Sequence, residues 1–360
     1  MKRVLLFIDS LGPGGAQRQM VGLAKLLNDA GYGVKIIYYH PIVFYKANLD
    51  EYDIENECIR GAANKWKRFG KIYNSIKLYR PDVVISYLDS PNIIVCVLKL
   101  AGLKYKLITS ERNTTQNLNF RERLKFFLLR KSDVIVTNSF SQKAFIDKYY
   151  PNLSSKVNII TNFVYTDFFC PYVGQKKKIE KRKCIIICVG RNTVQKNVLS
   201  FLDALYILNE KGYSFHVNWY GERYEPYYTQ CVTKCKALQL EHVFTFKLPT
   251  NNIVQEYLKA DVFCLPSIYE GFPNVLCEAM SCGLPVLCSN VCDNPMIVRN
   301  HSNGLLFNPH DVNDIVTKFE LFFKLSSDEK EKMGIKSRMY ALRDFSKESF
   351  FEKYKQIIES

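Results

Sequence analysis

Two glutamates, Glu270 and Glu278, stand eight residues apart in a segment that could hold a substrate. The apolar run 262–265 ends at Pro266 and is typical of a buried strand, and Asn274 is placed to cap a helix after it. Glu270 then lies on the loop at the strand's carboxyl end, and Glu278 lies about one turn into the helix. Ligands bind at that edge of an open α/β sheet, and the first N–H groups of the helix suit a phosphate or a sugar hydroxyl.

A pair of cations precedes the glutamates in the same half of the chain. The apolar run 184–189 leads into Gly190, and Arg191 and Lys196 follow five residues apart. On a loop at a strand's carboxyl end, each cation can reach one phosphate of a pyrophosphate, Arg as a fork and Lys as a point charge. Two ordinary surface cations are the alternative, and the glutamates downstream favour the site.

A glycine-rich turn over residues 12–18 joins the first apolar run to the first amphipathic segment. Glycines let a backbone approach a ligand closely at a helix N-terminus. The pattern Gly-x-Gly-x-x-Gly is absent, which disfavours a nicotinamide cofactor.

Both halves of the chain alternate short β-rich runs with amphipathic helical segments, which predicts an α/β protein of two doubly wound domains with parallel sheets. We expect the domains over 1–170 and 184–345, a solvated lysine-rich linker over 171–183, and a closing helix over 346–360. Two domains hinged at this linker would face each other across a cleft suited to a substrate. Strands are expected at 4–8, 34–38, 83–86, 106–109, 134–137 and 157–160, and at 184–189, 215–219, 243–246, 262–265, 286–288 and 304–307.

Length and composition narrow the class of protein. A chain of 360 residues exceeds one hydrophobic core, and 47% apolar residues exclude a mostly disordered protein. No apolar run is long enough for a membrane span or a secretory leader. The twelve Cys form no Cys-x-x-Cys pair, so we expect reduced thiols in a cytoplasmic protein and no metal site.

The net charge of +15 is uneven along the chain. Residues 1–170 hold 25 Lys and Arg against 14 Asp and Glu, a net of +11, whereas residues 171–360 hold 25 against 21, a net of +4. A basic first half attracts phosphates in nucleic acid, in an anionic membrane or in a pyrophosphate-bearing substrate. Charge alone does not choose among these three.

The segment 120–131 is a basic amphipathic helix. One face is expected to be the core stripe and consists of Phe120, Leu124, Phe127 and Leu128. The opposite face carries an apolar pair flanked by cations, namely Phe126 and Leu129 with Arg123, Lys125 and Arg130. Such a face suits an anionic membrane surface, and a solvated basic helix, favoured by Glu122, is the alternative.

The three motifs resemble the E-x7-E, Gly-Arg-(x)4-Lys-Asn and Gly-Gly-Ala/Ser-Glu/Gln-Arg elements of retaining glycosyltransferases of family 4, which share the two-domain GT-B architecture. The resemblance covers nearly the whole chain and is strongest over 184–310. It implies a transferase that moves a sugar from a UDP- or GDP-sugar to a glycan on a polyprenyl diphosphate, in surface polysaccharide or lipopolysaccharide assembly. It further implies a peripheral enzyme on the cytoplasmic face of the membrane, with no cofactor, no metal and no nucleic acid partner.

The resemblance also assigns roles to residues. Arg191 and Lys196 would neutralise the leaving diphosphate, Glu270 would lie by the transferred sugar, and the first domain would face the acceptor. Glu278 would accept hydrogen bonds from the ribose. The donor site would comprise Gly15, Arg191, Lys196, Glu270, Gly271, Phe272, Pro273, Asn274, Val275 and Glu278. Candidates on the acceptor or sugar side are Gln17, Arg18, Glu111, Arg112 and Asn113.

Three departures from the family pattern leave alternatives open. Arg112 stands where many relatives carry a His, and it either binds an acceptor phosphate or acidic sugar or serves as a structural ion-pair partner. Leu248 replaces a Gly near the nucleobase, and residues 292–295 replace a Gly-Gly-x-Pro-Glu turn. The rival functions are a GT-B nucleotide-sugar epimerase, a class that lacks this E-x7-E segment, and a non-catalytic module that binds anions or nucleic acid.

Overall fold

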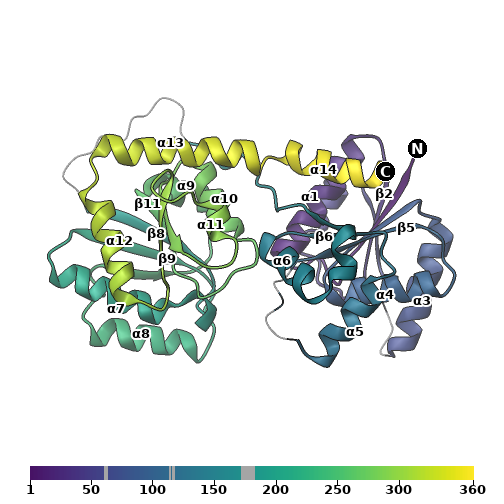
Figure 1. The fold of residues 1–360 in the computed structure, drawn as a ribbon, viewed down its shortest axis with the longest axis horizontal. Coiled ribbons are helices and arrows are strands. Elements are labelled where there is room, and N and C mark those ends of the chain that lie inside the picture. Colours follow the sequence, from purple (N-terminus) through teal and green to yellow (C-terminus); the bar gives the residue numbers. More distant parts are fainter. Residues whose placement is uncertain (61–63, 113–114, 116–117, 172–182) are drawn as a thin grey trace. The chain divides into compact units, whose positions relative to one another are not determined.

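The chain folds into two compact units (Figure 1). The computed structural model describes residues 1–60, 64–112, 115, 118–171 and 183–360. The first unit comprises Met1–Asn162 and Glu348–Ser360, and the second comprises Phe163–Lys347. Each unit contains one parallel sheet and is described by itself.

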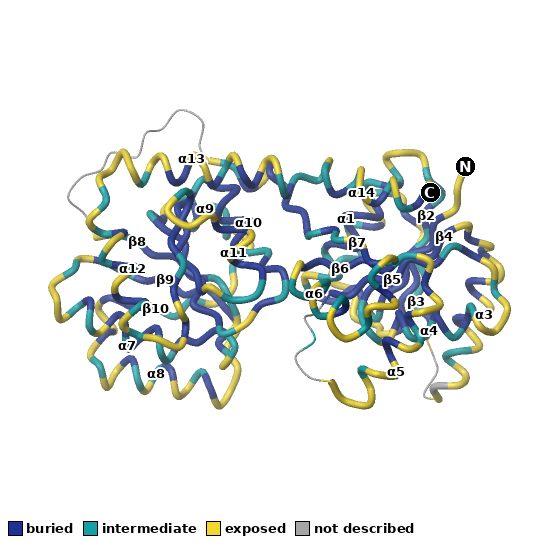
Figure 2. The backbone as a smooth tube through the Cα atoms, in the orientation of Figure 1, coloured by how far each residue is buried: buried dark blue, intermediate teal, exposed yellow. Residues whose placement is uncertain are grey.

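The sheet of the first unit has seven strands in the order β3-β2-β1-β4-β5-β6-β7, and all neighbours are parallel. Its central strands are Val, Ile and Leu runs that are buried along their length (Figure 2), as expected for a sheet covered on both faces. The strands are β1 (Arg3–Phe7), β2 (Gly33–Tyr38), β3 (Glu55–Cys58), β4 (Val83–Tyr87), β5 (Lys106–Glu111), β6 (Val134–Thr137) and β7 (Val157–Ile159).

Helices connect these strands, and local polar side chains begin several of them. Asn119 accepts a hydrogen bond from the N–H of Glu122 at the start of α5, and Ser139 caps α6 in the same way. The helices are α1 (Gly15–Asp29), α2 (Lys46–Glu51), α3 (Lys65–Tyr79), α4 (Asp89–Leu100), α5 (Phe120–Leu129), α6 (Phe140–Tyr149) and the 3-10 helix η1 (Pro151–Lys156). The C-terminal helix α14 (Lys347–Glu359) buries Phe350, Tyr354 and Ile358.

The sheet of the second unit has six parallel strands in the order β10-β9-β8-β11-β12-β13. Its two faces carry separate apolar clusters, one around Trp219 and Phe319 and the other around Phe263 and Met280. The strands are β8 (Cys184–Val189), β9 (Phe215–Tyr220), β10 (Phe244–Lys247), β11 (Val262–Leu265), β12 (Val286–Ser289) and β13 (Gly304–Phe307).

The helices of the second unit include two that support the candidate site, α10 (Asn274–Ser281) and α13 (Ser327–Asp344). A Cβ added to Gly334 of α13 would lie 2.3 Å from the carbonyl oxygen of Gly283, so glycine permits this close approach at the end of α10. The others are η2 (Val194–Lys196), α7 (Val198–Glu210), α8 (Tyr227–Ala237), α9 (Ile253–Lys259), α11 (Asn294–Ile297) and α12 (Val312–Lys324).

The fold class expected from the sequence is confirmed, and each expected strand is present with its ends shifted by no more than two residues. Strand β3 was missed. Its sequence, Glu-Asn-Glu-Cys, has no apolar run, because it forms the edge of the sheet and is only partly covered.

The boundary between the units also differs from the expectation. Residues 163–171 were assigned to the first domain and the linker, but the second unit begins at Phe163. The N–H of Val164 donates to the carbonyl of Phe345, and the Phe169 ring packs edge-on against Tyr257. These contacts fasten the segment to the second unit. The rest of the expected linker, residues 172–182, lies outside the described residues.

Helix α5 has the opposite orientation to the one expected. Phe126 and Leu129 are fully buried, with the ring of Phe126 stacked at 4.2 Å on that of Tyr150, whereas Phe120 and Phe127 are 83% and 60% exposed. The reason is Lys125, which was counted as a surface cation. Lys125 points inward to the buried carboxylate of Glu111, and the neighbouring Phe126 and Leu129 lie in the core with it. Phe126, Leu129 and Lys125 are therefore excluded as a membrane-facing set.

All twelve cysteines lie in described segments and have free thiols. Burial raises the pKa of the Cys277 thiol and raises that of Cys96 to about 11. Within the described segments, no helix is both long and apolar enough to cross a bilayer. The described residues also contain no cluster of three or more His, Cys, Asp or Glu arranged to hold a metal ion.

Candidate active site

The candidate site of the second unit lies where β8 and β11 end. These strands are parallel neighbours, with Phe263 beside Ile187, so the loops that follow them emerge at the same edge. The loops are joined by two hydrogen bonds, from the N–H of Ile268 to the carbonyl of Gln195 at 2.8 Å and from the Gln195 amide to the carbonyl of Tyr269 at 2.9 Å. The sheet and these bonds therefore fix both loops before any ligand arrives.

Lys196 and Glu270 meet at this edge. The Lys196 ammonium lies 2.5 Å from Oε1 of Glu270, and both side chains are buried. Burial strengthens such a pair because little water competes for either charge. Nothing in the sequence indicated this contact, because the two residues are 74 positions apart.

The backbone around Lys196 is shaped to hold the side chain. A Cβ on Gly190 would lie 3.0 Å from Cε of Lys196, so the lysine stem passes directly over the glycine. Asn197, which follows, has a left-handed conformation with φ of 57° and donates its amide to the carbonyl of Pro309 at 2.8 Å. These contacts fix the backbone at Lys196, whereas the torsion angles of its side chain are not constrained by them.

Glu278 is placed by helix α10. It is buried, and the hydroxyl of Tyr257 on α9 donates to its Oε2 at 3.3 Å. Asn274 was expected to cap the helix, but it is already the first helical residue, and Pro273 occupies the cap position without a side-chain hydrogen bond. Tyr257 was not foreseen, because an apolar position on a short helix gives no sign of a contact with a carboxylate.

Arg191 does not take part in the Lys196–Glu270 ion pair. Its side chain is exposed, and its guanidinium lies 5.7 Å from the centroid of the Tyr224 ring. Among the other expected donor residues, Phe272 is buried and packs edge-on against Phe345, whereas Gly271, Asn274 and Val275 are half-buried. The structure therefore brings Lys196 to Glu270, and leaves Arg191 at the rim of the same edge.

In the first unit, the glycine-rich turn lies at the carboxyl end of β1. Gly15 begins α1 and is exposed, and no acidic residue or side-chain cap occupies the first turn of that helix. Gln17 donates to Oδ1 of Asp9 at 3.1 Å, and Arg18 is half-buried in the same turn. Asp9, the residue that holds Gln17, was not foreseen from the sequence.

Glu111 belongs to a buried network. It ends β5, and its Oε2 lies 2.7 Å from the ammonium of Lys125, which also lies 3.1 Å from Asp89 and 2.8 Å from Glu122. Burial raises the pKa of Glu111 against the opposing pull of Lys125. Burial by itself lowers the pKa of Lys125, but Glu111 and Asp89 outweigh it and hold that pKa above its usual value. Glu111 is thus engaged in the interior of the unit.

Arg112 is buried as well. Its guanidinium lies 4.4 Å from the centroid of the Tyr87 ring, and its Nη2 donates to Oδ1 of Asn162. The Tyr87 hydroxyl in turn lies 2.8 Å from that of Tyr354 on α14. Arg112 therefore supports the packing of this part of the first unit through a ring and an amide. Asn113 lies outside the described residues.

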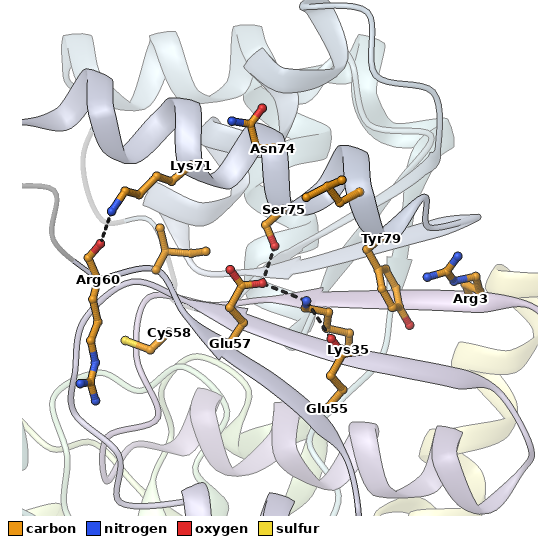
Figure 3. A pocket seen from close by; sticks show the side chains of 12 residues that line it. Arg3, Lys35, Glu55, Glu57, Cys58, Arg60, Lys71, Asn74, Ser75 and Tyr79 are labelled. Carbon is orange, nitrogen blue, oxygen red and sulfur yellow. Dashed lines mark hydrogen bonds and ion pairs between the residues drawn. The ribbon is translucent and has the colours of Figure 1, made fainter.

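A pocket of about 640 Å³ lies beside β3 and α3 (Figure 3). Lys35 contacts both Glu55 and Glu57 at 2.9 Å, and Ser75 donates to Glu57 at 2.7 Å. Lys71 donates to the carbonyl of Arg60. Because these charged groups satisfy one another along the edge strand, we assign no substrate to this pocket.

Comparison with known proteins adds to this geometry. Residues 13–168 match the family model described as Glycosyltransferase Family 4, and residues 174–339 match the model described as Glycosyl transferases group 1. Together the two models span both loops of the candidate site and every strand of the two sheets except β1.

Similar proteins have related descriptions. A Campylobacter jejuni protein named GalNAc-alpha-(1->4)-GalNAc-alpha-(1->3)-diNAcBac-PP-undecaprenol alpha-1,4-N-acetyl-D-galactosaminyltransferase is 28% identical over 348 residues, which are 92% of this chain and 91% of the relative. A glycosyltransferase structure from Rickettsia africae has a TM-score of 0.88 at 20% identity and covers 99% of this chain and 98% of its own. Anabaena HepE in complex with UDP has a TM-score of 0.87 at 16% identity over the whole of both chains.

Proposed function

The chain belongs to the glycosyltransferases of family 4, with a group 1 domain in its second unit, and from this membership we propose that it transfers a sugar from a nucleoside-diphosphate sugar to a lipid-linked glycan with retention of configuration. The observation that carries the proposal is the buried contact of Lys196 with Glu270 at the carboxyl edge of the second sheet, on the loop that leads into the helix bearing Glu278. That arrangement supports the assignment of the cation to a phosphate and of the carboxylate to a sugar.

The proposed chemistry assigns one task to each group. Negative charge grows on the departing diphosphate as the glycosidic bond breaks, and Lys196 and Arg191 neutralise it. Glu270 lies by the transferred sugar, where its carboxylate steadies the positive charge that develops on the ring. Glu278 accepts hydrogen bonds from the ribose. Because the cations belong to the chain itself, transfer is expected to continue in the presence of a metal chelator.

The nature of the acceptor is supported from two directions. The Campylobacter relative is named for an acceptor carried on an undecaprenol diphosphate, and the first half of this chain has a net charge of +11 that attracts a pyrophosphate. One structural relative, Anabaena HepE, is described in complex with UDP, so UDP-sugars are the first donors to test. We propose that the protein acts in the assembly of surface polysaccharide, at the cytoplasmic face of the membrane.

The proposed membrane contact is supported by the observed exposed face of α5, which replaces the face expected from the sequence. The exposed apolar side chains are Phe120, Leu124 and Phe127 on the helix and Leu118 just before it. They are accompanied by exposed Arg121, Arg123 and Arg130, and the Arg130 guanidinium lies 5.4 Å from the centroid of the Phe127 ring. Apolar rings among cations suit an anionic lipid surface, which would keep the enzyme near an acceptor that cannot leave the bilayer.

The direct test of the proposed activity is a panel of UDP- and GDP-sugars, incubated with the purified protein and an undecaprenyl-diphosphate glycan. We expect one donor to be consumed and its sugar to appear on the lipid with its anomeric configuration kept. Interconversion of the free donor sugar would favour the epimerase. Nucleic acid binding without donor turnover would favour the anion-binding module. Either result would replace the proposal.

A further inference from the structure

The cation that is proposed to bind the donor diphosphate already has a partner. Lys196 is held at 2.5 Å by Glu270, and both are buried at the carboxyl edge of the second sheet. The two loops that bear them are joined by the Ile268–Gln195 and Gln195–Tyr269 hydrogen bonds. The contact is therefore built into the architecture of the site and does not depend on a mobile loop.

The two proposed roles conflict with this contact. Lys196 can neutralise a diphosphate only if its ammonium turns toward the phosphate oxygens. Glu270 can bind the sugar only if its carboxylate is released from the ammonium of Lys196. An anion that approaches Lys196 also meets the negative charge of Glu270, which opposes its binding.

We propose that the Lys196–Glu270 ion pair is exchanged on donor binding, with Lys196 passing to the diphosphate and Glu270 to the hydroxyl groups of the sugar. This inference rests on the proposed function. It adds that recognition of the diphosphate and recognition of the sugar are a single coupled event. A nucleoside diphosphate without its sugar opens the pair but offers Glu270 no new partner.

The structure allows this exchange by side-chain rotation. The backbone of Lys196 is fixed by the 3-10 helix η2, which ends at this residue, and by the Asn197–Pro309 hydrogen bond. The lysine stem lies over Gly190, where a Cβ would be only 3.0 Å from Cε of Lys196, so the glycine leaves the space that the stem needs. Among the described residues, Glu270 is the one carboxylate within ion-pair distance of Lys196, so a single contact must open.

The coupling has a consequence for product release. The intact donor compensates both members of the pair, whereas the nucleoside diphosphate that remains after transfer compensates only Lys196. Glu270 therefore favours departure of the product relative to the donor. Removing the negative charge of Glu270 should tighten binding of the free nucleoside diphosphate while it slows transfer.

The experiment is a calorimetric titration of UDP into the wild-type protein and into Glu270→Gln, with GDP as the second probe. We expect Glu270→Gln to bind UDP about three- to tenfold more tightly, where tenfold corresponds to about 1.4 kcal/mol. The matched control is Glu320→Gln on α12 of the same unit, which removes a carboxylate that lies 2.7 Å from Lys211 and should show no such gain. Glu270→Asp, which keeps the charge but withdraws it by one methylene, provides a second variant if the amide variant fails to fold.

A second arm asks whether the gain passes through Lys196. In a Lys196→Met background, Glu270→Gln should tighten UDP binding less than it does in the wild-type background. An equal gain in both backgrounds would show simple removal of a repelling charge, and an unchanged or weaker UDP affinity in Glu270→Gln would show that the pair is not opened by the diphosphate. Either result overturns the exchange and leaves the transferase standing. Failure of wild type to bind UDP or GDP would instead count against the proposed function.

Discussion

Two buried lysines, one in each unit, meet a glutamate at the carboxyl edge of a parallel sheet, and they differ in how many carboxylates surround them. Lys125 contacts Glu111, Asp89 and Glu122, whereas Lys196 contacts Glu270. Lys125 forms ion pairs with three carboxylates, so the local charge remains negative even with the lysine in place. Lys196 is balanced by one charge that an incoming phosphate can replace. A buried Lys–Glu pair therefore stabilises the first unit, whereas in the second unit, as we propose, it binds the substrate.

The structural lysine should show the largest effect on stability. Lys125→Met leaves three carboxylates without their cation, and removal of one partner from a buried ion pair costs roughly 3–5 kcal/mol. Urea unfolding should show this loss in the free energy of unfolding, while the UDP affinity of the second unit stays as in wild type. Lys131→Met, on an exposed neighbour, is the matched control and should change stability by less than about 0.5 kcal/mol. Equal stability of Lys125→Met and wild type would remove the distinction between the two lysines.

The substrate lysine should show its effect in the rate. Lys196→Ala removes the group that neutralises the departing diphosphate, so transfer should fall by about a hundredfold or more, as when one oxyanion donor is lost. Affinity for the nucleoside diphosphate should fall as well. Steady-state kinetics with the best donor and a UDP titration measure both. Unchanged values of kcat/KM and of UDP affinity would contradict the role given to Lys196.

The burial of Lys125 also determines which face of α5 is exposed. If Phe120 and Phe127 on that face contact a membrane, binding of the protein to anionic vesicles should require both these rings and the arginines beside them. Arg123→Ser with Arg130→Ser should weaken binding by roughly thirtyfold, at about 1 kcal/mol for each cation. Binding of the wild-type protein should fade with salt, because exposed charges are screened over about 8 Å at physiological ionic strength.

The matched control for this face is Leu78→Ser, because Leu78 is 82% exposed on another helix of the same unit. It should sediment like wild type, whereas Phe120→Ser with Phe127→Ser should sediment less. Equal sedimentation of all variants would make α5 an ordinary solvated helix.

The smallest effect on donor binding is expected from Tyr257, the uncharged partner of Glu278. Tyr257→Phe removes the hydroxyl that lies 3.3 Å from Glu278, and one neutral hydrogen bond contributes about 0.5–1.5 kcal/mol. KM for the donor should rise about two- to tenfold with little change in kcat, because Glu278 is assigned to binding. Glu278→Ala should raise KM more, by about ten- to a hundredfold. A fall in kcat alone for Tyr257→Phe would assign Glu278 to the chemical step.

The sequence predicted the parts of the molecule that depend on local pattern. The strands around Cys184–Val189 and Val262–Leu265 are continuous apolar runs, and Asn274, expected as a cap, is the first residue of α10. What it missed depends on contacts between distant residues. The Lys196–Glu270 pair joins positions 74 apart, and the burial of Lys125 depends on Glu111. Because a lysine is usually exposed, the helical wheel of α5 was rotated to the wrong side.

The central claim is that Lys196 exchanges one carboxylate for the donor diphosphate while Lys125 keeps all three. A crystal structure with the nucleoside diphosphate of the best donor tests it directly. We predict that Lys196 contacts a phosphate oxygen and no longer contacts Glu270, and that the contacts of Lys125 are unchanged. A bound nucleotide with the Lys196–Glu270 contact intact would contradict the account.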